Sequence, residues 1–471
     1  MHTIFNVSFD TFTREIYVEI QKTFMQDAVI QENQETECTA EPKRVISGFT
    51  ATMIVVASMV GTGVFTTTGF LLEETPSAPV VLWAWLIGGI VAFFGALAYA
   101  ELVAMYPKNG GEYQLLSKIY HPAVGFVAGW VSLIVGFSAP IASAAMAFGA
   151  YADNCIPILN PSWLAIIIIL LLSTIHAAKV TWGSMFQNVF TVLKILLVGS
   201  FIIGGLTLGD SSRIIHETAT DTGLMMLSPA FAIGLIYVTY AYTGWNGSAY
   251  LAGEIKNPKK ALPKALALGT AIVTLIYLGL NAVFLSAAPI DQLSGQIEVG
   301  SVAATALFGN GIGQIFSAVI ALLLVSSLSA MIMAGPRIYQ SMGCDYPAFR
   351  LLSKRVGDSG PFYAIALQAL IAIGMIFTAS FDQLIMYMGF TLSVSSAMAV
   401  LGVFIMRRRA PKAERPYKCW GYPVTPTLFI LLSLWMIIFT IIQNPMVALA
   451  GAGTILVGVI LYFIVRPKTA K

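Results

Sequence analysis

SGFTATMIVVASMVGTGVFTTTGF, Ser47–Phe70, is the segment that most strongly indicates the architecture of the protein. It is long and apolar enough to cross a lipid bilayer as a helix. Near its middle lies Gly61-Thr62-Gly63, a residue mix poorly suited to a helix interior. Unwound backbone is tolerated inside a membrane only where it faces protein or a water-filled cavity. The stretch therefore predicts a membrane helix that opens at this triplet, although small residues there also suit close packing between helices.

An opened helix of this kind would bind an anion. The freed N–H groups point out from the start of the second half-helix, where the positive end of the helix dipole lies. We therefore expect a substrate carboxylate at this point.

The composition identifies a polytopic membrane protein. Of the 471 residues, 57% are hydrophobic and 10% are charged, and the mean hydropathy is +0.80. Soluble domains carry about 25% charged residues. The fold class predicted is all-α.

We predict twelve membrane-spanning helices from the apolar segments. They fall at 46–70, 79–105, 123–151, 162–178, 185–208, 227–253, 261–288, 311–335, 362–380, 383–406, 424–442 and 446–465. The predicted parts are a first five-helix repeat at 46–208, a second at 227–406, and helices 11 and 12 at 424–465. Residues 1–45 are a polar N-terminal extension, which is predicted to be an amphipathic helix, a disordered tail or an over-extended reading frame.

The basic residues set the orientation. If the N-terminus is cytoplasmic, all but two of the 26 Lys and Arg residues fall in cytoplasmic segments. The exceptions are Arg213, outside, and Lys194, within a span. So one-sided a distribution supports both the number of spans and cytoplasmic N- and C-termini.

No arrangement of residues suggests catalysis, a metal or a cofactor. The four histidines are scattered, and the cysteines (Cys38, Cys155, Cys344 and Cys419) lack metal-ligand spacing. Because only Cys155 is predicted to face outside, no internal disulfide is expected. We predict that the protein is not an enzyme and has no nucleic-acid partner.

The sixth span repeats the pattern of the first. Pro229–Gly253 has the run Tyr242-Thr243-Gly244-Trp245 near its middle. Interrupted spans at matching positions of two halves indicate a transporter site at the repeat interface. Because each half has an odd number of spans, the second repeat is predicted to be inverted relative to the first.

Four segments resemble the amino acid–polyamine–organocation superfamily of transporters, and the similarity runs from about Ile46 to the C-terminus. They are MVGTGVF (59–65), YPKNGGEY (106–113) with Gly129-Trp130, GEIKNPKK (253–260) with Pro263, and RPY (415–417) with GYPVTP (421–426). The resemblance implies a five-plus-five inverted-repeat core with discontinuous helices 1 and 6, two further helices, and amino acid transport by alternating access.

By the same resemblance, the main chain around Met59, Thr62 and Gly63 would hold the substrate carboxylate and part of the ammonium. Carbonyls near Tyr240 and Thr243, beside Gly244, would take the rest of the ammonium. This agrees with the electrostatics, in which half-helix N-termini favour anions and unwound carbonyls favour cations.

The side chain of Tyr240 is a gate candidate, and Trp245 is a second. For either ring, packing or interfacial anchoring is an equally good interpretation.

Lys194 lies nine residues into the fifth predicted span, about 14 Å from its start at 1.5 Å per residue. A lysine at that depth is costly and should face the protein interior. In some members of the superfamily, a lysine of the fifth span stands where related transporters bind sodium. The resemblance therefore suggests sodium independence and proton coupling through Lys194; the alternative is a charged tether. The run Ser326-Ser327-Leu328-Ser329 is a candidate partner surface.

Two other segments carry expectations. Lys108–Pro122 has apolar residues at helical spacing and predicts a helix lying on the inner membrane surface. Cys155 lies in an outer loop where light chains of heteromeric amino acid transporters carry a cysteine that bonds a heavy subunit. Without other signs of that subfamily, we expect a free thiol and no covalent partner.

These observations predict a secondary amino acid transporter in the plasma or inner membrane. Its predicted partners are the lipid bilayer, an amino acid and, in the proton-coupled interpretation, protons. An exchanger without proton coupling is the nearest alternative. A non-transporting amino acid sensor on the same fold is another. A channel is disfavoured because no ring of charged or filter-like residues is evident.

Overall fold

The computed structural model describes residues 44–154, 159–178, 183–216, 222–354 and 361–466. These residues contain helices and no strand; their one β-type pairing is an isolated bridge between Ile46 and Ile255. The protein is therefore an all-α polytopic membrane protein, as the composition predicts. Among the described residues, ten helices are long and apolar enough to cross a membrane.

The first five predicted spans form helices close to their predicted ends. They are α2 (Gly48–Met59) with α3 (Thr62–Glu74), α4 (Ala78–Met105), α6 (Pro122–Val131) continuing through η1 (Ser132–Ser138) into α7 (Ala139–Asp153), α8 (Pro161–Ala178) and α9 (Gly183–Leu208).

The remaining spans follow the same pattern. They are α12 (Pro229–Tyr242) with η2 (Gly247–Glu254), α13 (Pro258–Ala287), α16 (Asn310–Asp345), α18 (Phe362–Thr378), α19 (Phe381–Arg409), α20 (Val424–Gln443) and α21 (Pro445–Val465). The sixth span is divided, and α18 has 17 residues, so the count of twelve spans stays a prediction. The boundaries of the two repeats also stay predictions.

The first and sixth spans are both broken, as predicted. The first breaks at Val60 and Gly61 between α2 and α3, and the sixth breaks over residues 243–246 between α12 and η2. Both spans begin with a serine N-cap, because Ser47 Oγ accepts from the Thr50 N–H and Ser228 Oγ accepts from the Phe231 N–H. The two broken spans thus start with the same local signal.

The ends of these two spans also meet. The Ile46 N–H donates to the Glu254 carbonyl at 2.9 Å, and the Lys256 N–H donates to the Ile46 carbonyl at 2.8 Å. This pairing joins the start of the first span to the end of the sixth.

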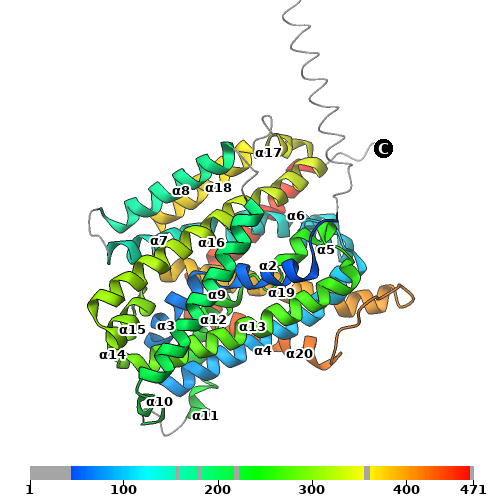
Figure 1. Cartoon of the computed structure of the whole chain (residues 1–471). Coiled ribbons are helices and arrows are strands. Elements are labelled where there is room, and N and C mark those ends of the chain that lie inside the picture. The colour runs from blue at the N-terminus through cyan, green and yellow to red at the C-terminus, as the bar shows by residue number, and fades with distance from the viewer. Residues whose placement is uncertain (1–43, 155–158, 179–182, 217–221, 355–360, 467–471) are drawn as a thin grey trace, which may run out of the picture. The chain divides into compact units, whose positions relative to one another are not determined.

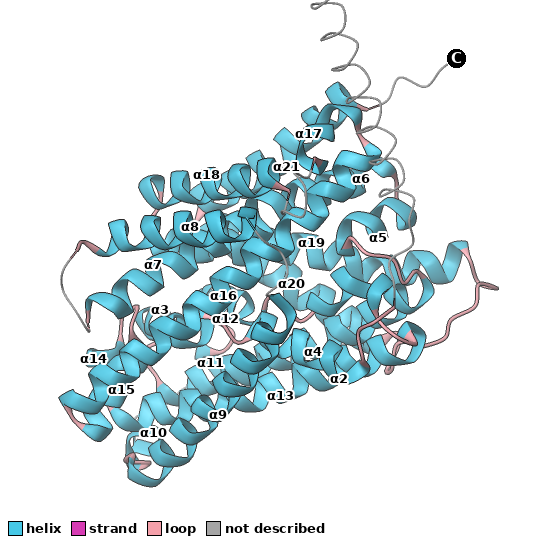
Figure 2. Ribbon diagram, turned by 45° about the horizontal axis from the view of Figure 1, so that its top comes forward, coloured by secondary structure: helices cyan, strands magenta, loops and turns pink. Residues whose placement is uncertain are grey.

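Helix packing places both breaks inside the bundle. α12 packs against α3, α4 and α19, while α13 packs against α2, α4 and α9. α8 and α18 lie side by side at one edge, and α13 and α4 lie at the other (Figures 1 and 2). The breaks therefore lie among protein neighbours, which is the condition under which irregular backbone is stable in a membrane.

Three helices differ from the prediction made from the sequence: two were not predicted, and one has different surroundings. α14 (Ile290–Leu293) and α15 (Val299–Phe308) lie between α13 and α16, where the sequence analysis places no helix. α5 (Gly111–Ile119) forms the helix expected after the second span, but its Glu112, Tyr113 and Leu116 are buried against α6, α19 and η2. α5 is thus packed against other helices of the protein, and its position at the membrane surface stays a prediction.

The third span has a π-helical segment, η1, inside an otherwise α-helical run. Such segments occur frequently at functional sites. The Phe137 ring lies at its C-terminal end, 6.1 Å between ring centroids from Tyr250 of η2 and 6.5 Å from Tyr339 of α16. The segment therefore packs against the half of the sixth span that follows the break.

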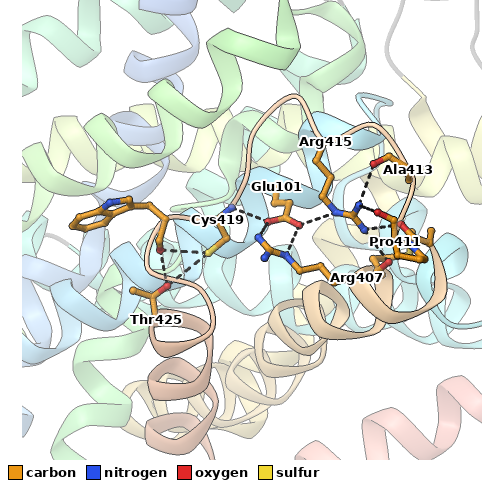
Figure 3. Close-up of polar contacts among 10 residues, drawn as sticks. Glu101, Arg407, Pro411, Ala413, Arg415, Cys419 and Thr425 are labelled. Carbon is orange, nitrogen blue, oxygen red and sulfur yellow. Dashed lines mark hydrogen bonds and ion pairs between the residues drawn. The ribbon is translucent and has the colours of Figure 1, made fainter.

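A charged clamp holds the segment between α19 and α20 against α4 (Figure 3). Glu101 of α4 is fully buried and accepts two hydrogen bonds from Arg407, at 3.0 and 2.7 Å. Arg415 pairs with the same carboxylate at 3.3 Å, and the Cys419 N–H donates to it at 2.7 Å. One buried carboxylate thus binds the last turn of α19 and two points of the segment that follows it.

Candidate functional site

The two helix breaks touch backbone to backbone. A Cβ added at Gly63 would lie 2.5 Å from the Ala241 Cα, so only glycine allows α3 to approach α12 this closely. Gly244 has φ +95°, which favours glycine, and a Cβ there would lie 2.7 Å from the Ser58 carbonyl oxygen. These predicted site residues therefore permit the two breaks to meet.

A chain of hydroxyl groups crosses the junction. The Thr62 hydroxyl and the Tyr240 hydroxyl are 2.7 Å apart, and the Tyr240 hydroxyl is 3.1 Å from the Ser143 hydroxyl of α7. Thr62 and Tyr240 were predicted to be near each other, and the structure brings them into direct contact. The ring of Tyr240 thus joins the first span, the sixth span and the third.

Tyr277 of α13 holds both breaks from one side, a residue that the sequence analysis missed. Its hydroxyl donates to the Met59 carbonyl at 2.6 Å and lies 2.9 Å from the Ala241 carbonyl. The signal that could have found it is its type, since a buried tyrosine within an apolar span needs a polar partner.

The carbonyl groups predicted to bind ammonium are partly engaged by the protein. The Met59 carbonyl accepts from Tyr277. The Tyr240 carbonyl accepts from both the N–H and the hydroxyl of Thr243, at 2.9 and 2.6 Å. A carbonyl oxygen has two lone pairs, so Met59 keeps one acceptor position while both positions of Tyr240 are used.

The start of α3 has the polarity expected of an anion site. Its N-cap is Gly61, which makes no side-chain cap hydrogen bond. The first N–H groups of a helix have no partner within that helix. The positive end of this half-helix therefore faces the junction without a capping side chain.

Accessible surface reaches the junction. Ser58 is exposed although it lies near the end of α2, and Gly61, Thr243 and Gly244 are partly exposed. Met59 and Tyr240, in contrast, are 2% and 5% exposed. Part of the surface of the break residues is therefore accessible.

Trp245 packs between elements beside the junction. Its ring is 5.4 Å between centroids from Tyr99 of α4 and 6.5 Å from Phe429 of α20, edge-on in both cases. These contacts agree with the packing interpretation of Trp245. Tyr240, by contrast, joins the hydroxyl chain.

Lys194 contacts the first break directly. Its ammonium donates to the Val60 carbonyl at 2.8 Å and to the Ser327 hydroxyl at 2.9 Å. Val60 is the C-cap of α2, so Lys194 satisfies a carbonyl released by the break. Ser327 belongs to the predicted hydroxyl run, whose Ser329 lies 2.7 Å from His176 Nε2 of α8. In the part of the chain that the structure describes, no ion pair joins Lys194 to a carboxylate.

α15 packs against α3 and is linked to it through Tyr151. Tyr151 of α7 donates to the Phe65 carbonyl at 2.8 Å and accepts from the Gly300 N–H of α15 at 3.2 Å. The unpredicted helix α15 therefore completes this end of the site.

The cysteines differ in part from expectation. Cys419 is free and buried, but Cys344 is disulfide-bonded, so the expectation of no internal disulfide is wrong. Cys155 lies outside the described residues.

Comparisons with known proteins point to one family. Residues 46–465 match the family described as Amino acid permease. The chain is 30% identical over 417 residues to the serine/threonine exchanger SteT of Bacillus subtilis (strain 168), covering 86% of this chain and 92% of that protein. It is 32% identical over 409 residues to the b(0,+)-type amino acid transporter 1 of Mus musculus, covering 83% and 81%. It is 27% identical over 442 residues to the Large neutral amino acids transporter small subunit 2 of Mus musculus, covering 90% and 81%.

The match covers both broken spans, the junction between them and the segment held by Glu101. The relatives are amino acid transporters by name. The chain therefore belongs to the amino acid permease family of multi-pass membrane transporters.

Proposed function

We propose that the protein is a secondary active transporter that moves amino acids across the plasma or inner membrane by alternating access. The observation that carries this proposal is the junction of two broken membrane helices, bridged by the Thr62 and Tyr240 hydroxyls. A bridge between two separate spans can form and break without breaking either helix. It therefore suits a site that opens alternately to the two sides.

In this proposal the main chain binds the zwitterion. The N-terminus of α3, at Thr62 and Gly63, takes the carboxylate, and the free acceptor position of Met59 takes part of the ammonium. Carbonyls beside Thr243 and Gly244 take the rest. Because the Tyr240 carbonyl is already satisfied twice, Tyr240 acts through its side chain as the gate.

The substrate proposed is a neutral amino acid. No Asp or Glu lies mid-span to pair with a cationic side chain, and one relative is named for serine and threonine. The cytoplasmic placement of both termini is part of the proposal and rests on the one-sided distribution of Lys and Arg.

The test is uptake into proteoliposomes that contain the purified protein. We expect labelled serine or threonine to accumulate above the level in protein-free vesicles. Binding without accumulation for any of the twenty amino acids would instead identify a sensor on this fold.

Exchange without proton coupling is the second candidate, and the relative named as an exchanger favours it. Vesicles preloaded with unlabelled amino acid separate the two. Uptake that requires preloading indicates obligate exchange, whereas uptake into empty vesicles that responds to a pH gradient indicates proton symport.

Lys194 is the proposed coupling residue. Its ammonium binds the Val60 carbonyl at the first break. A change in the charge of Lys194 would therefore change the hydrogen bonding and the electrostatic potential where the substrate is proposed to bind. We expect uptake to be the same in sodium and in choline. We expect Lys194→Ala to flatten the pH profile, while the exposed Lys264→Ala leaves it unchanged. If Lys194→Ala keeps the wild-type pH profile, Lys194 does not couple protons to transport and serves only as a charged tether between helices.

We also propose that Cys155 is a free thiol with no covalent heavy subunit. One relative is named as a small subunit, which makes the point worth testing. On a non-reducing gel we expect the protein to migrate as in the reducing gel. A larger complex that dissociates on reduction, and that is absent in Cys155→Ser, would overturn the proposal of a free thiol.

A further inference from the structure

The cytoplasmic end of the sixth span is held by α5 and the residues just before it. The Asn109 side chain accepts from the Gly253 N–H at 2.8 Å and donates to Glu254 at 3.2 Å, and the Gly110 N–H donates to the Tyr250 carbonyl at 3.3 Å. Tyr113 donates to Asp345 of α16. We call these contacts, together with those of Glu112, the inner latch.

Glu112 is the buried centre of the inner latch. It is 5% exposed and accepts from Asn246 Nδ2 at 3.2 Å and from the Ser395 hydroxyl of α19 at 2.6 Å. Asn246 lies in the break of the sixth span, directly after Trp245. One carboxyl therefore connects α5, α19 and the sixth-span break.

No basic group neutralises this carboxyl in the described part of the chain, where Glu112 forms no ion pair. Two phenols interact with it, Tyr99 of α4 and Tyr250 of η2. The Tyr99 hydroxyl is fully buried, and its polar neighbour is the Asn246 side chain. Charged groups on the surrounding elements have their own partners: Asp345 with Tyr113, Glu254 with Asn109 and Arg337, and Arg409 with the Ile119 carbonyl.

Burial raises the pKa of the Glu112 carboxyl, and the hydrogen bond from Ser395 offsets this in part. α5 lies outside the helices long enough to span the membrane. A raised pKa in the packed conformation means that the packed conformation favours the protonated acid. As pH rises, the charged carboxylate favours any conformation that brings water to it.

We propose that Glu112 is a proton-binding positioning residue whose ionisation loosens the inner latch and frees the cytoplasmic half of the sixth span. As a neutral acid, Glu112 keeps its bonds to Asn246 and Ser395 at little cost. After it loses its proton to solvent, a buried charge without a basic partner remains, and opening of α5 from η2 and α19 hydrates it. This inference rests on the proposed function, because it assigns the residue that controls the inner side of that site.

The experiment is hydrogen–deuterium exchange of Gly111–Ile119 and Gly247–Glu254 in the full-length protein. Wild type and Glu112→Gln are compared at the same pH, so that the intrinsic pH dependence of exchange cancels. Gln mimics the neutral acid because it can accept from Asn246 and donate to the Ser395 oxygen. At about pH 4, below the ordinary pKa of a glutamic acid, we expect equal rates, and at about pH 8 we expect wild type to exchange about threefold faster or more.

A second variant keeps the carboxyl and guards against misfolding of Glu112→Gln. Ser395→Ala removes the bond that favours the carboxylate, so the pH at which both segments loosen should move upward. A ratio of wild type to Glu112→Gln that is the same at both pH values, or no displacement in Ser395→Ala, would make Glu112 a purely structural carboxyl. If the protein transports no amino acid, the proposed function fails, while the exchange comparison still decides the role of Glu112.

Discussion

Tyr240 illustrates how one hydroxyl group can unite three membrane spans. Its phenol lies between the Thr62 and Ser143 hydroxyls and is 5% exposed. Each of these hydroxyls can donate or accept a hydrogen bond, so the row of hydroxyl groups can rearrange without leaving one of them without a partner. This is a property of individual residue types, which the sequence displays but cannot pair.

A double-mutant cycle tests the contact of Tyr240 with Thr62. Tyr240→Phe removes the hydroxyl without a cavity, and Thr62→Val removes its partner. We expect each change to lower the kcat/KM of uptake about 5- to 30-fold, as one buried hydrogen bond is worth about 1–2 kcal/mol. Because both changes remove one contact, the double variant should lose less than the product of the two effects. If the two effects multiply, Tyr240 and Thr62 do not share a hydrogen bond. The control is the double variant Tyr240→Phe with Thr427→Val, because Thr427 is exposed at the start of α20 and its effect should be independent.

At the scale of elements, the close approach of α3 and α12 decides the site. Gly63 faces the Ala241 backbone, whereas Gly199 of α9 has no heavy atom within 4 Å of its added Cβ. Both glycines lie in membrane helices, but only Gly63 has backbone close to its added Cβ. Gly199 is therefore a matched control for a Gly→Ala substitution at Gly63.

Gly63→Ala should separate α3 from α12. Because the obstacle is backbone, relief requires a helix shift that costs about 1–3 kcal/mol or more. We expect a lower melting temperature and loss of uptake. Gly199→Ala should keep the melting temperature and the uptake of the wild type. Equal behaviour of the two variants in detergent thermal unfolding and in uptake would show that the approach of the helices is not required.

The clamp around Glu101 is a second feature of this scale. Glu101→Gln leaves Arg407 and Arg415 without their carboxylate, so we expect a loss of about 3 kcal/mol in the free energy of unfolding. Glu414→Gln is the control, because Glu414 is 78% exposed and its pairing with Lys259 should contribute less than about 1 kcal/mol.

The measurement is thermal unfolding, together with limited proteolysis of residues 410–423. Faster cleavage in Glu101→Gln than in Glu414→Gln is the expected result. Identical cleavage would mean that packing of Tyr422 and Thr425, rather than the charged clamp, holds this segment.

At the scale of the whole molecule, the two breaks form one site only because distant segments assemble around them. α13 supplies Tyr277, α7 supplies Ser143 and Tyr151, and α9 supplies Lys194. A ligand that binds this assembled site and not the unfolded chain must raise its stability.

A thermal-shift screen of the twenty amino acids tests this assembled site. A ligand at 100 times its dissociation constant should add about 2.7 kcal/mol of stability. The methyl ester of the same amino acid, which lacks the carboxylate, should give a much smaller shift, since the start of α3 binds the anion. An ester as effective as the free amino acid would contradict main-chain recognition of the carboxylate.

The amino-acid sequence was sufficient to predict the all-α membrane fold, because long apolar segments and the placement of Lys and Arg are local properties that the bilayer selects. It also located the breaks at Gly61 and Gly244, since glycine marks where a membrane helix can open. It identified Lys194 and its hydroxyl-rich partner segment because polar residues within a span are few. Three-dimensional contacts were needed to show which carbonyls Tyr277 and Thr243 occupy, that α15 is linked to α3 through Tyr151, and that α5 is buried around Glu112. Those outcomes depend on contacts between residues up to about 280 positions apart, such as Glu112 with Ser395, and such contacts leave no periodic trace in the chain.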